Sequence, residues 1–400
     1  MTNADTPALG VGMVGYAFMG RAHSQAWRTV GPFFDPPYTP RMVALAGRSR
    51  EGVGAAARQL GWASVETDWK ALLRRGDIQV IDICTPGDSH AEIAIAALDA
   101  GKHVLCEKPL ANTVAEAEAM TAAAERAASR GIRSMVGFNY RRVPAIALAR
   151  RFVADGRLGS IRHVRAQYLQ DWIVDPDFPL VWRLDKEKAG SGALGDIGAH
   201  IIDTAQFITG DHLIGVSAIM ETFVKERPIA EASAGLGASS GTGTGRVTVD
   251  DAAVFIGRTA GGVLASFEAT RFATGRKNAL RIEVNGSLGT IAFDFESMNE
   301  LQFYDHTLDD ADAGFRRILV TESAHPYMAA WWPPGHLIGY EHTFTHEIRD
   351  FVDAIANETD PVPSFADGLR VQRVLAAVER SATSGNGWTE VTDATAVEDT

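Results

Sequence analysis

Two short segments of the chain carry residue types that together can remove a proton from an alcohol. Asp196 and His200 stand four positions apart, so a helix that begins near Gly195 would project both side chains from one face. Lys108 follows the apolar run Val104–Cys106, which is typical of a buried strand. An ammonium, a carboxylate and an imidazole can polarise a hydroxyl group and take its proton. An alcohol dehydrogenase needs such a set, together with a hydride acceptor nearby.

The N-terminal segment carries a motif for such an acceptor. An apolar stretch from Leu9 to Val14 leads into Gly15-Tyr-Ala-Phe-Met-Gly20, and a helical stretch follows over Arg21 to Arg28. A dinucleotide fingerprint requires this strand–turn–helix context, because the helix N-terminus offers N–H groups to a pyrophosphate. The second glycine of the common motif is Ala17 here, whose methyl group could crowd the phosphates. A plain tight turn is the alternative.

Length and composition narrow the class of protein. Four hundred residues exceed most single cores, so two domains are expected. The net charge of −12 and the lack of a lysine or arginine run argue against nucleic acid as a partner. We expect neither a signal peptide nor a membrane segment, because residues 1–8 are polar and no apolar run is long enough. Cys84 and Cys106 lack metal-ligand spacing, which predicts buried reduced thiols, no metal site and a cytoplasmic protein.

Residues 1–150 are expected to form a dinucleotide-binding domain of the α/β class. Strand-like and helix-like runs alternate there, which implies a parallel sheet covered on both faces. A ligand would bind at the carboxyl ends of the strands. After the N-terminal strand, the expected strands are residues 41–46, 80–84, 102–106 and 133–138, and the expected helices are residues 90–100 and 114–129.

Residues 151–400 are expected to form a substrate-binding and oligomerisation domain of the α+β class. Short alternating strands separated by turns predict a large, mostly antiparallel open sheet. The helices over about 340–381 could pack back on the first domain. Residues 233–245 are nearly all glycine, alanine, serine and threonine, which predicts a mobile loop. The expected strands are residues 161–172, 215–220, 247–255, 263–270, 280–285, 290–293 and 301–304, with helices near 199–209, 340–357 and 365–381.

Four motifs in this order resemble those of the Gfo/Idh/MocA oxidoreductase family. They are Gly15-Tyr-Ala-Phe-Met-Gly20, Thr85-Pro86 with His90, Glu107-Lys108-Pro109, and Gly192-Ala-Leu-Gly-Asp196-Ile-Gly-Ala-His200. The resemblance covers essentially the whole chain and implies a Rossmann domain followed by an open-sheet domain. Within the family the chain is most similar to the levoglucosan dehydrogenase and inositol dehydrogenase-like branch, through residues 138–145, 168–172, 190–194 and 364–368.

The resemblance implies that Lys108, Asp196 and His200 are catalytic. His200 would act as the general base, since the ordinary histidine pKa of about 6.5 is close to working pH. Lys108 would stabilise the developing alkoxide, and Asp196 would bind a substrate hydroxyl. The resemblance also makes the Lys108–Pro109 bond a candidate cis peptide. The alternatives are that Asp196 only caps a helix and that His200 is a hydrogen-bonded core residue.

A nicotinamide cofactor is implied as well, and the choice between NAD and NADP depends on one loop. The second strand ends at Ala46-Gly47-Arg48, with no acid to hold a ribose diol, while an arginine can pair with a 2′-phosphate. We therefore expect NADP to be preferred or well accepted, although the levoglucosan dehydrogenase resemblance favours NAD. A solvated loop charge is the alternative for Arg48. The cofactor contacts implied are Gly15, Ala17, Phe18, Met19, Arg48, Ser49, Thr85, Pro86, His90, Glu107, Lys108 and Asn139, with an exposed helix position as the alternative for His90.

Aromatic and arginine residues beside these motifs indicate a polyhydroxylated ring as substrate. Tryptophan faces pack against the C–H face of a sugar, and arginine and aspartate bind its hydroxyls. Substrate contacts are therefore expected from Tyr140, Arg141, Trp172, Arg183, Asp196 and His200, with a core position as the alternative for Trp172.

The expected activity is an NAD(P)-dependent dehydrogenase acting on a secondary ring hydroxyl of a sugar, an anhydro-sugar or a cyclitol. A glycosidase that uses NAD as a transient redox aid and a non-catalytic sugar or nucleotide sensor are the alternatives, because fold similarity alone does not exclude them. We also expect a homo-oligomer, a tetramer or a dimer, because the outer face of an open sheet needs a cover.

Overall fold

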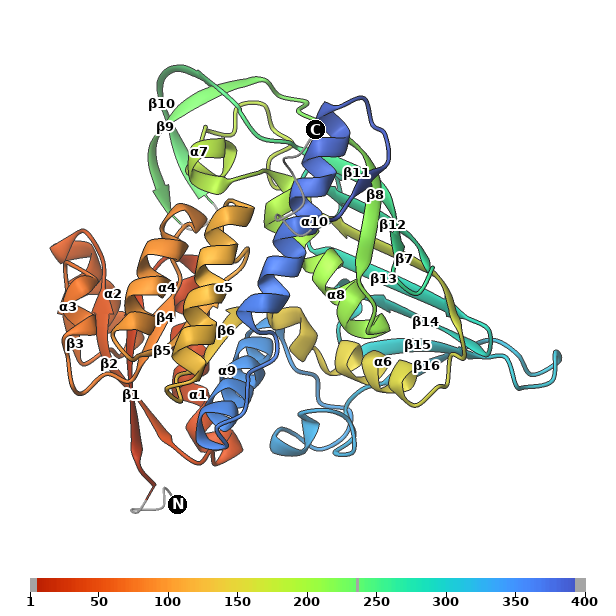
Figure 1. Cartoon of the computed structure of the whole chain (residues 1–400), viewed down its shortest axis with the longest axis horizontal. Coiled ribbons are helices and arrows are strands. Elements are labelled where there is room, and N and C mark those ends of the chain that lie inside the picture. Colours follow the sequence, from red (N-terminus) through yellow and green to blue (C-terminus); the bar gives the residue numbers. More distant parts are fainter. Residues whose placement is uncertain (1–5, 235–236, 393–400) are drawn as a thin grey trace. The chain divides into compact units, whose positions relative to one another are not determined.

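The computed structural model describes residues 6–234 and 237–392, and the contacts of the chain divide it into two compact units (Figure 1). The first unit, called unit one, draws on residues 1–139, 234–237 and 339–370. The second, called unit two, draws on residues 140–233, 238–338 and 371–400. The domain boundary expected near residue 150 stays a prediction.

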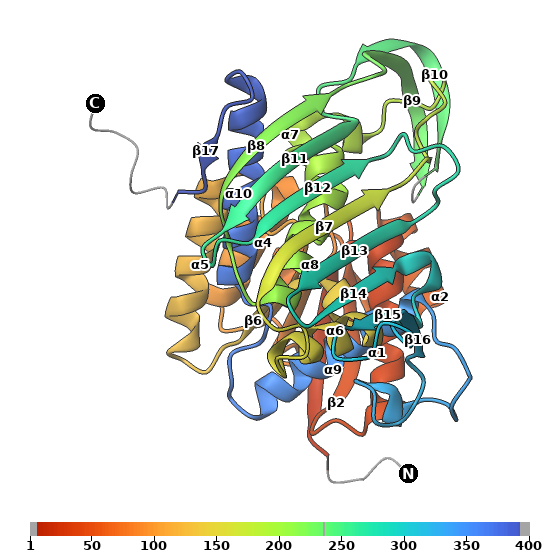
Figure 2. The same cartoon turned by 90° about the vertical axis from the view of Figure 1, so that its right-hand side faces the viewer.

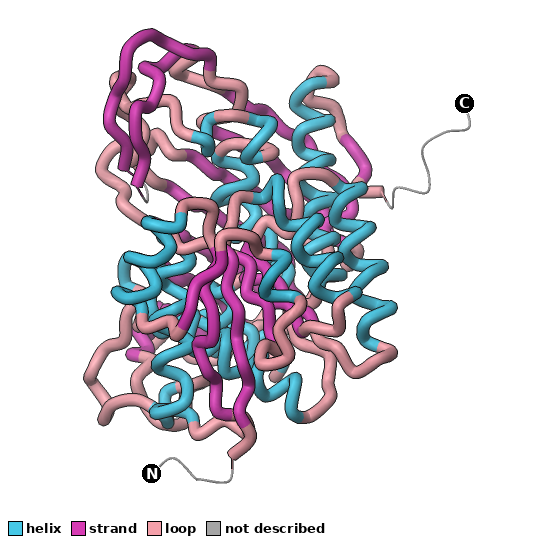
Figure 3. Tube along the Cα trace, turned by 90° about the vertical axis from the view of Figure 1, so that its left-hand side faces the viewer, coloured by secondary structure: helices cyan, strands magenta, loops and turns pink. Residues whose placement is uncertain are grey.

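Unit one contains a six-stranded sheet in the order β3-β2-β1-β4-β5-β6, in which every neighbouring pair is parallel. Helices flank this sheet on both sides (Figure 3), and all residues of β4 are buried. This arrangement confirms the expected doubly wound domain. Its strands are β1 (Ala8–Val14), β2 (Thr39–Ala46), β3 (Ser64–Glu66), β4 (Val80–Ile83), β5 (His103–Glu107) and β6 (Ser134–Gly137).

Two helices of unit one begin where the sequence places a side-chain hydrogen-bond acceptor. Ser49 caps α2, and Thr113 and Glu116 form a capping box at the start of α5. The late helix α9 belongs to the same core, since Phe344 and Phe351 pack with Trp27 of α1. The helices are α1 (Phe18–Phe34), α2 (Arg50–Leu60), α3 (Lys70–Leu73), α4 (His90–Asp99), α5 (Val114–Ala128) and α9 (Tyr340–Ala356).

Unit two contains a nine-stranded sheet in the order β16-β15-β14-β13-β7-β12-β11-β8-β17, seen face-on in Figure 2. β7 and β12 run parallel, and the other pairings among the described strands are antiparallel, which confirms the expectation. The strands are β7 (Ile161–Leu169), β8 (Leu213–Glu221), β11 (Ala252–Thr259), β12 (Leu264–Thr270), β13 (Ala279–Gly286), β14 (Gly289–Asp294), β15 (Glu300–Asp305), β16 (Phe315–Leu319) and β17 (Thr389–Glu390).

The two faces of this sheet differ. Residues alternate between buried and exposed along β7 and β11, as expected for a sheet with one covered face. Helices α6 (Pro144–Ala154) and α8 (Ala199–Thr209) pack on the buried face, while Ile219 of β8 and Val254 of β11 lie exposed on the other. The short helix α7 (Lys186–Ala189) lies in unit two, and α10 (Phe365–Thr383) contributes residues to both units.

The mobile loop expected over residues 233–245 is wrong. Residues 237–246 form strand β10 (Gly237–Arg246), which pairs with β9 (Glu226–Ala234) in a two-stranded sheet. Residues 235–236 lie outside the described residues. Most side chains of β10 are exposed, so the composition correctly indicated little burial. A strand needs only backbone pairing, which small residues permit when a partner strand is close.

Two further expectations concern the class of protein. Both cysteines are buried free thiols, as expected. Within the described part of the chain, no helix has the length and apolar character needed to cross a bilayer.

Candidate active site

A tight turn joins β1 to α1 at the carboxyl end of β1. Gly15 has a φ of +97°, and a Cβ atom there would lie 2.7 Å from the backbone oxygen of Cys84, so this position requires glycine. Ala17 adopts an ordinary extended conformation as the N-cap of α1, and its side chain is exposed. The first helical N–H groups, those of Phe18 and Met19, therefore begin a helix where an anion can bind. The geometry has the features of a dinucleotide turn and tolerates alanine at position 17.

The loop after β2 contains the residues expected to contact the ribose. Ser49 accepts a hydrogen bond from the Gly52 N–H at 3.1 Å, so its hydroxyl serves as the cap of α2. Arg48 is exposed and forms no hydrogen bond or ion pair with the residues that the structure describes. Its guanidinium is thus available to a ligand.

The segment after β4 is fixed by a histidine beneath it. The Ser89 hydroxyl lies 2.7 Å from Oγ1 of Thr85, and Pro86 precedes a short 3-10 turn. His90 is buried, and its two ring nitrogens lie 2.9 Å from the carbonyl oxygen of Thr85 and 3.0 Å from that of Pro109. The exposed helix position given above as the alternative for His90 is therefore wrong. His90 links the loops after β4 and β5 at the carboxyl edge, and its contact with the cofactor stays a prediction.

Lys108 and Asn139 lie at the ends of the next two strands. Lys108 is half-buried, and the Lys108–Pro109 bond is cis, as expected. The side chain of Glu107 turns inward and accepts a hydrogen bond from the Lys108 N–H at 3.1 Å. Asn139 is buried and donates to Thr343 Oγ1 at 2.9 Å. The residues expected to bind the cofactor thus lie at or just beyond the carboxyl ends of parallel strands, or one helical turn further.

In unit two, the Asp196 and His200 segment differs from the expected α-helix. Leu194–Gly198 forms a π-helix, and only Ala199–Thr209 is α-helical. The wider π turn means that the α-helical spacing assumed for Asp196 and His200 does not apply. Neither helix start has a side-chain cap, so Asp196 is not an N-cap residue. π-Helical turns occur often at functional sites.

Asp250 fixes the start of this π-helix. Its carboxylate accepts hydrogen bonds from the N–H groups of Gly192 and Leu194, both at 2.7 Å. Its carbonyl oxygen accepts from the Ala193 N–H at 3.0 Å. A Cβ atom at Gly192 would lie 1.8 Å from that oxygen, so the close approach requires glycine. A buried carboxylate therefore holds the loop that presents Asp196.

Two arginines surround Asp196. The guanidinium of Arg271 is completely buried, with Nη1 3.7 Å from Asp196 Oδ2 and Cζ 5.6 Å from the Trp172 ring. Burial lowers the pKa of Arg183, and the charge of Asp196 opposes that shift. The Asp196 side chain is 31% exposed. The Asp196 carboxylate is therefore accessible to a ligand, while the neighbouring Arg271 cation is shielded from solvent.

His200 lies against two tyrosines on the buried face of the sheet. Its ring centroid is 4.5 Å from that of Tyr140 and 5.9 Å from that of Tyr168. The two tyrosine hydroxyls are 2.6 Å apart. The imidazole is therefore held by aromatic packing next to a pair of hydroxyl groups.

A chain of hydrogen bonds extends from these tyrosines to Trp172. Tyr168 Oη and Gln170 Nε2 both donate to Asn278 Oδ1, at 2.7 and 2.8 Å. Trp172 Nε1 donates to Gln170 Oε1 at 3.1 Å. Trp172 is half-buried, so it is not a fully enclosed core aromatic. These hydrogen bonds fix the side-chain rotamers of a surface called the wall, which consists of Tyr140, Tyr168, Gln170, Trp172 and Asn278. The wall presents both aromatic rings and polar groups.

Arg141 has a different environment from the one expected. Its guanidinium forms a buried two-bond pair with Asp203, with Nε–Oδ2 at 2.8 Å and Nη2–Oδ1 at 2.5 Å. It also lies over the Phe207 ring. Asp203 and Phe207 thus hold the Arg141 guanidinium, and its contact with substrate stays a prediction.

Three residues of this site were missed by sequence reasoning. Arg271, Asn278 and Asp250 reach it from segments distant in the chain, and nothing in their local sequence distinguishes them. The strand expected over residues 161–172 includes Tyr168, Gln170 and Trp172, of which only Tyr168 lies in β7. Within unit two the structure brings together Asp196, His200, Tyr140, Trp172 and Arg183, whereas Lys108 belongs to unit one.

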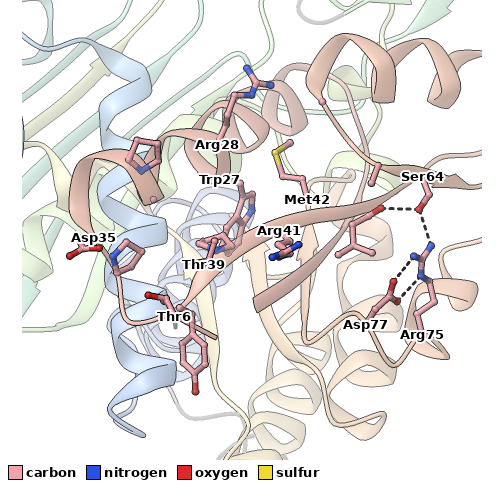
Figure 4. Close-up of a pocket in the computed structure, with 18 residues that line it drawn as sticks. Thr6, Trp27, Arg28, Asp35, Thr39, Arg41, Met42, Ser64, Arg75 and Asp77 are labelled. Atoms are coloured by element: carbon pink, nitrogen blue, oxygen red, sulfur yellow. Dashed lines mark hydrogen bonds and ion pairs between the residues drawn. The ribbon is translucent and has the colours of Figure 1, made fainter. Parts of the chain in front are cut away.

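A hollow of about 670 Å³ lies elsewhere in unit one (Figure 4). It is lined by residues such as Trp27, Thr39, Arg41 and Arg75, and Thr39 is the first residue of β2. It therefore lies toward the amino end of β2, opposite the edge that carries Gly15. None of the residues predicted for the cofactor lines it.

Comparison with known families matches both parts of the chain. The model described as "Oxidoreductase family, NAD-binding Rossmann fold" matches residues 9–138. The model described as "GFO/IDH/MocA C-terminal domain" matches residues 146–292.

Individual relatives match over nearly the full length. Levoglucosan dehydrogenase of Pseudarthrobacter phenanthrenivorans is 43% identical over 388 residues, which is 96% of this chain and 98% of that protein. An oxidoreductase domain protein from Kribbella flavida is 67% identical, with a TM-score of 0.93 and coverage of 97% and 100% of the two chains. The structure of levoglucosan dehydrogenase with NADH and levoglucosan is 41% identical, with a TM-score of 0.90 and coverage of 96% and 100%.

Proposed function

Because the chain belongs to the GFO/IDH/MocA family of oxidoreductases, we propose that it oxidises a secondary ring hydroxyl of a sugar, an anhydro-sugar or a cyclitol. The hydride acceptor is a nicotinamide dinucleotide, which takes the hydride when bound to the Rossmann domain. The relatives named above include a levoglucosan dehydrogenase and its complex with NADH and levoglucosan.

One observation carries the proposal: the Asp196 carboxylate and the His200 imidazole stand beside a wall fixed by hydrogen bonds. That wall runs from Tyr140 to Trp172 and offers ring faces together with amide and hydroxyl groups. A ring with several hydroxyls satisfies both kinds of surface. A mainly apolar alcohol would leave polar groups unpaired, at a cost of roughly 1–3 kcal/mol each.

We propose a role for each of three residues. His200 takes the hydroxyl proton as the general base. Lys108 stabilises the alkoxide that develops on the same oxygen. Asp196, backed by Arg271 at 3.7 Å, binds a neighbouring hydroxyl and orients the ring.

For the cofactor, we propose that Arg48 lets the chain accept NADP. The support is its exposed guanidinium just beyond β2, where no acid is present to hold a ribose diol. Titration with both cofactors tests this, with Arg48→Ala as the matched variant. We expect Arg48→Ala to raise the NADP dissociation constant about tenfold, as expected when a charge-assisted hydrogen bond is lost. A tenfold preference of the unaltered enzyme for NAD would contradict the proposal.

We also propose that the chain forms a homo-oligomer, most simply a tetramer, through the open face of the nine-stranded sheet. Ile219 is 63% exposed there, and Val254, its cross-strand partner, is 53% exposed. Apolar side chains gathered on one face of a sheet favour burial against a second surface. Ile219→Lys with Val254→Glu should reduce the mass measured by light scattering, and a monomeric mass for the unaltered chain would contradict the proposal. The cytoplasmic location also stays a prediction.

Screening sugars and inositols with NAD and NADP tests the function directly. A dehydrogenase accumulates reduced nicotinamide, seen as absorbance at 340 nm. An NAD-assisted glycosidase would cleave a glycoside without that accumulation, and a sensor would bind without turnover. We expect accumulation with at least one member of the panel and its loss in His200→Ala.

A further inference from the structure

We propose that His23, which lies outside the assigned catalytic set, positions Lys108 by holding the carboxylate of Glu107. The proposal rests on the role proposed above for Lys108. His23 and its two carboxylate partners, Asp82 and Glu107, are called the His23 cluster.

The His23 cluster lies in the core of unit one and joins α1 to two central strands. His23 of α1 is 0% exposed, and its Nδ1 lies 3.0 Å from both carboxylate oxygens of Asp82 at β4. Its Nε2 lies 2.9 Å from Oε1 of Glu107 at β5. Because carboxylates accept hydrogen bonds, both ring nitrogens donate when the ring is an imidazolium. Burial disfavours the charged ring, but Asp82 and Cys84 together raise the pKa of His23 well above 6.5.

Glu107 connects this buried cation to the proposed catalytic lysine. Its Oε1 accepts from His23, and its Oε2 accepts from the backbone N–H of Lys108 at 3.1 Å. A Cβ atom on Gly137 would lie 3.0 Å from Oε1, so the glycine leaves the carboxylate its space. Both oxygens of Glu107 are therefore engaged, and its orientation sets the position of the residue that follows β5.

A metal site is a competing interpretation of this cluster. Ligand atoms of His23, Asp82 and Cys84 lie within 4.8 Å of one another. However, burial raises the pKa of the Cys84 thiol, which therefore stays protonated at neutral pH. Asp82 already accepts from His23 and from Trp27 Nε1, the latter at 2.7 Å. Hydrogen bonds within the protein occupy the atoms that a metal would need.

A structural role is the second competing interpretation, because buried charges that lose a partner destabilise a core. The two interpretations differ in what a second substitution does. If His23 acts through Lys108, its loss should matter only while the lysine is present. If His23 only supports the core, its effect should multiply with that of Lys108→Ala.

The test compares His23→Gln with Trp27→Phe. His23→Gln removes the cation that holds Glu107, and we expect kcat to fall about 10–100-fold, as a small misplacement of a catalytic group can cause. Trp27→Phe removes a buried donor to Asp82 but does not reach Glu107 or Lys108, so kcat should change less than threefold. Circular dichroism and the thermal midpoint establish that each variant is folded.

Two double variants complete the test. In the Lys108→Ala background, His23→Gln should lower kcat by less than twofold. His23→Gln with Glu107→Gln removes the uncompensated charge while keeping an oxygen for the Lys108 N–H, so it should recover part of the kcat lost in His23→Gln. If His23→Gln does not fold, the test uses this double variant and Glu107→Gln in its place. The kcat of each is then compared with and without Lys108→Ala.

The outcomes separate the two proposals. Normal kcat in folded His23→Gln, or multiplication of its effect with that of Lys108→Ala, overturns the role of His23 and leaves the proposed function standing. Near-normal turnover in Lys108→Ala alone overturns the proposed role of the lysine, and the positioning role of His23 falls with it.

Discussion

His23 and His200 are both almost completely buried, at 0% and 6% exposure, yet their neighbours differ in kind. His23 lies between two carboxylates whose oxygens approach both ring nitrogens. His200 lies against the rings of Tyr140 and Tyr168, in the segment that also carries the partly exposed Asp196. Burial alone therefore does not distinguish a histidine that keeps a proton from one proposed to exchange it.

Two carboxylates lie next to the His23 ring. A histidine between carboxylates gains stability from its proton and releases it reluctantly. We infer that unit one uses a fixed imidazolium as part of its framework, and that unit two presents an imidazole for proton transfer.

The largest expected effect lies in the proposed catalytic set. Lys108→Ala, Asp196→Ala and His200→Ala should each lower kcat about 10²-fold or more, because each removes a group that acts on the reacting hydroxyl or its ring. Initial rates of nicotinamide reduction measure this. Cofactor binding, followed by fluorescence, should survive in the aspartate and histidine variants. Near-normal turnover in His200→Ala would end the contrast between the two histidines.

The second prediction concerns stability and pH at His23, which faces Asp82, Glu107 and Cys84. The unfolded chain releases the His23 proton near pH 6.5, whereas the folded chain keeps it to a higher pH. The stabilisation is therefore complete below about pH 6.5 and declines by about 1.4 kcal/mol per pH unit up to the raised pKa. Denaturant unfolding of the unaltered chain and of His23→Gln at several pH values should show this decline in their difference. A difference independent of pH would mean that His23 is neutral in the fold.

A smaller effect is expected from the wall beside His200. Tyr168→Phe removes a hydroxyl that hydrogen-bonds to Tyr140 and to Asn278, and kcat/KM should fall about tenfold, the net effect of about one lost hydrogen bond. Tyr304→Phe provides the matched control, since Tyr304 lies on β15 among other aromatic rings. Equal activities of the two variants would show that the hydrogen-bonded wall does not matter to substrate.

The smallest effect is expected at the edge of the His23 cluster. Trp27→Phe removes one donor to Asp82 and should lower the free energy of unfolding by about 1–2 kcal/mol. Between about pH 6.5 and the raised pKa of His23, the free energy of unfolding of Trp27→Phe should decline as steeply as that of the unaltered chain, because His23 keeps both carboxylates. Loss of that decline would show that Trp27 helps to hold the proton.

The dinucleotide turn was predictable because its requirements are local. Gly15 must adopt a positive φ beside the backbone of Cys84, and only glycine does so without strain, which leaves a recognisable spacing in the sequence. The parallel sheet and the positions of α4, α5, α8 and α9 followed in the same way from short apolar runs and helix signals. Asp196 lies in a π-helix and not in the expected α-helix. This changes the geometry of the motif, but the residue types and spacing by which the motif was recognised are the same.

The remainder depends on contacts between distant residues. Asp82 and Glu107 stand 59 and 84 positions after His23, and no local pattern pairs them. Arg271, which directly follows β12, lies close to Asp196, and Arg141 pairs with Asp203 of another helical segment. Strand β10 required a partner strand that its own composition does not reveal. Tertiary structure decides such pairings, and a single sequence does not display them.

The place of α9 in the core of unit one bears on how the chain is made. The α9 residues Phe344, Ile348, Phe351, Val352 and Ile355 complete a core whose other buried members lie within the first 135 residues. On the ribosome, the first 139 residues must wait for a segment more than 200 residues downstream, while the sheet of unit two can form in between. A truncated product that ends before Gly339 would expose the apolar side of α1 around Trp27 and Val30, which favours aggregation. Separate expression of unit one should therefore succeed only when residues 339–370 are supplied with it.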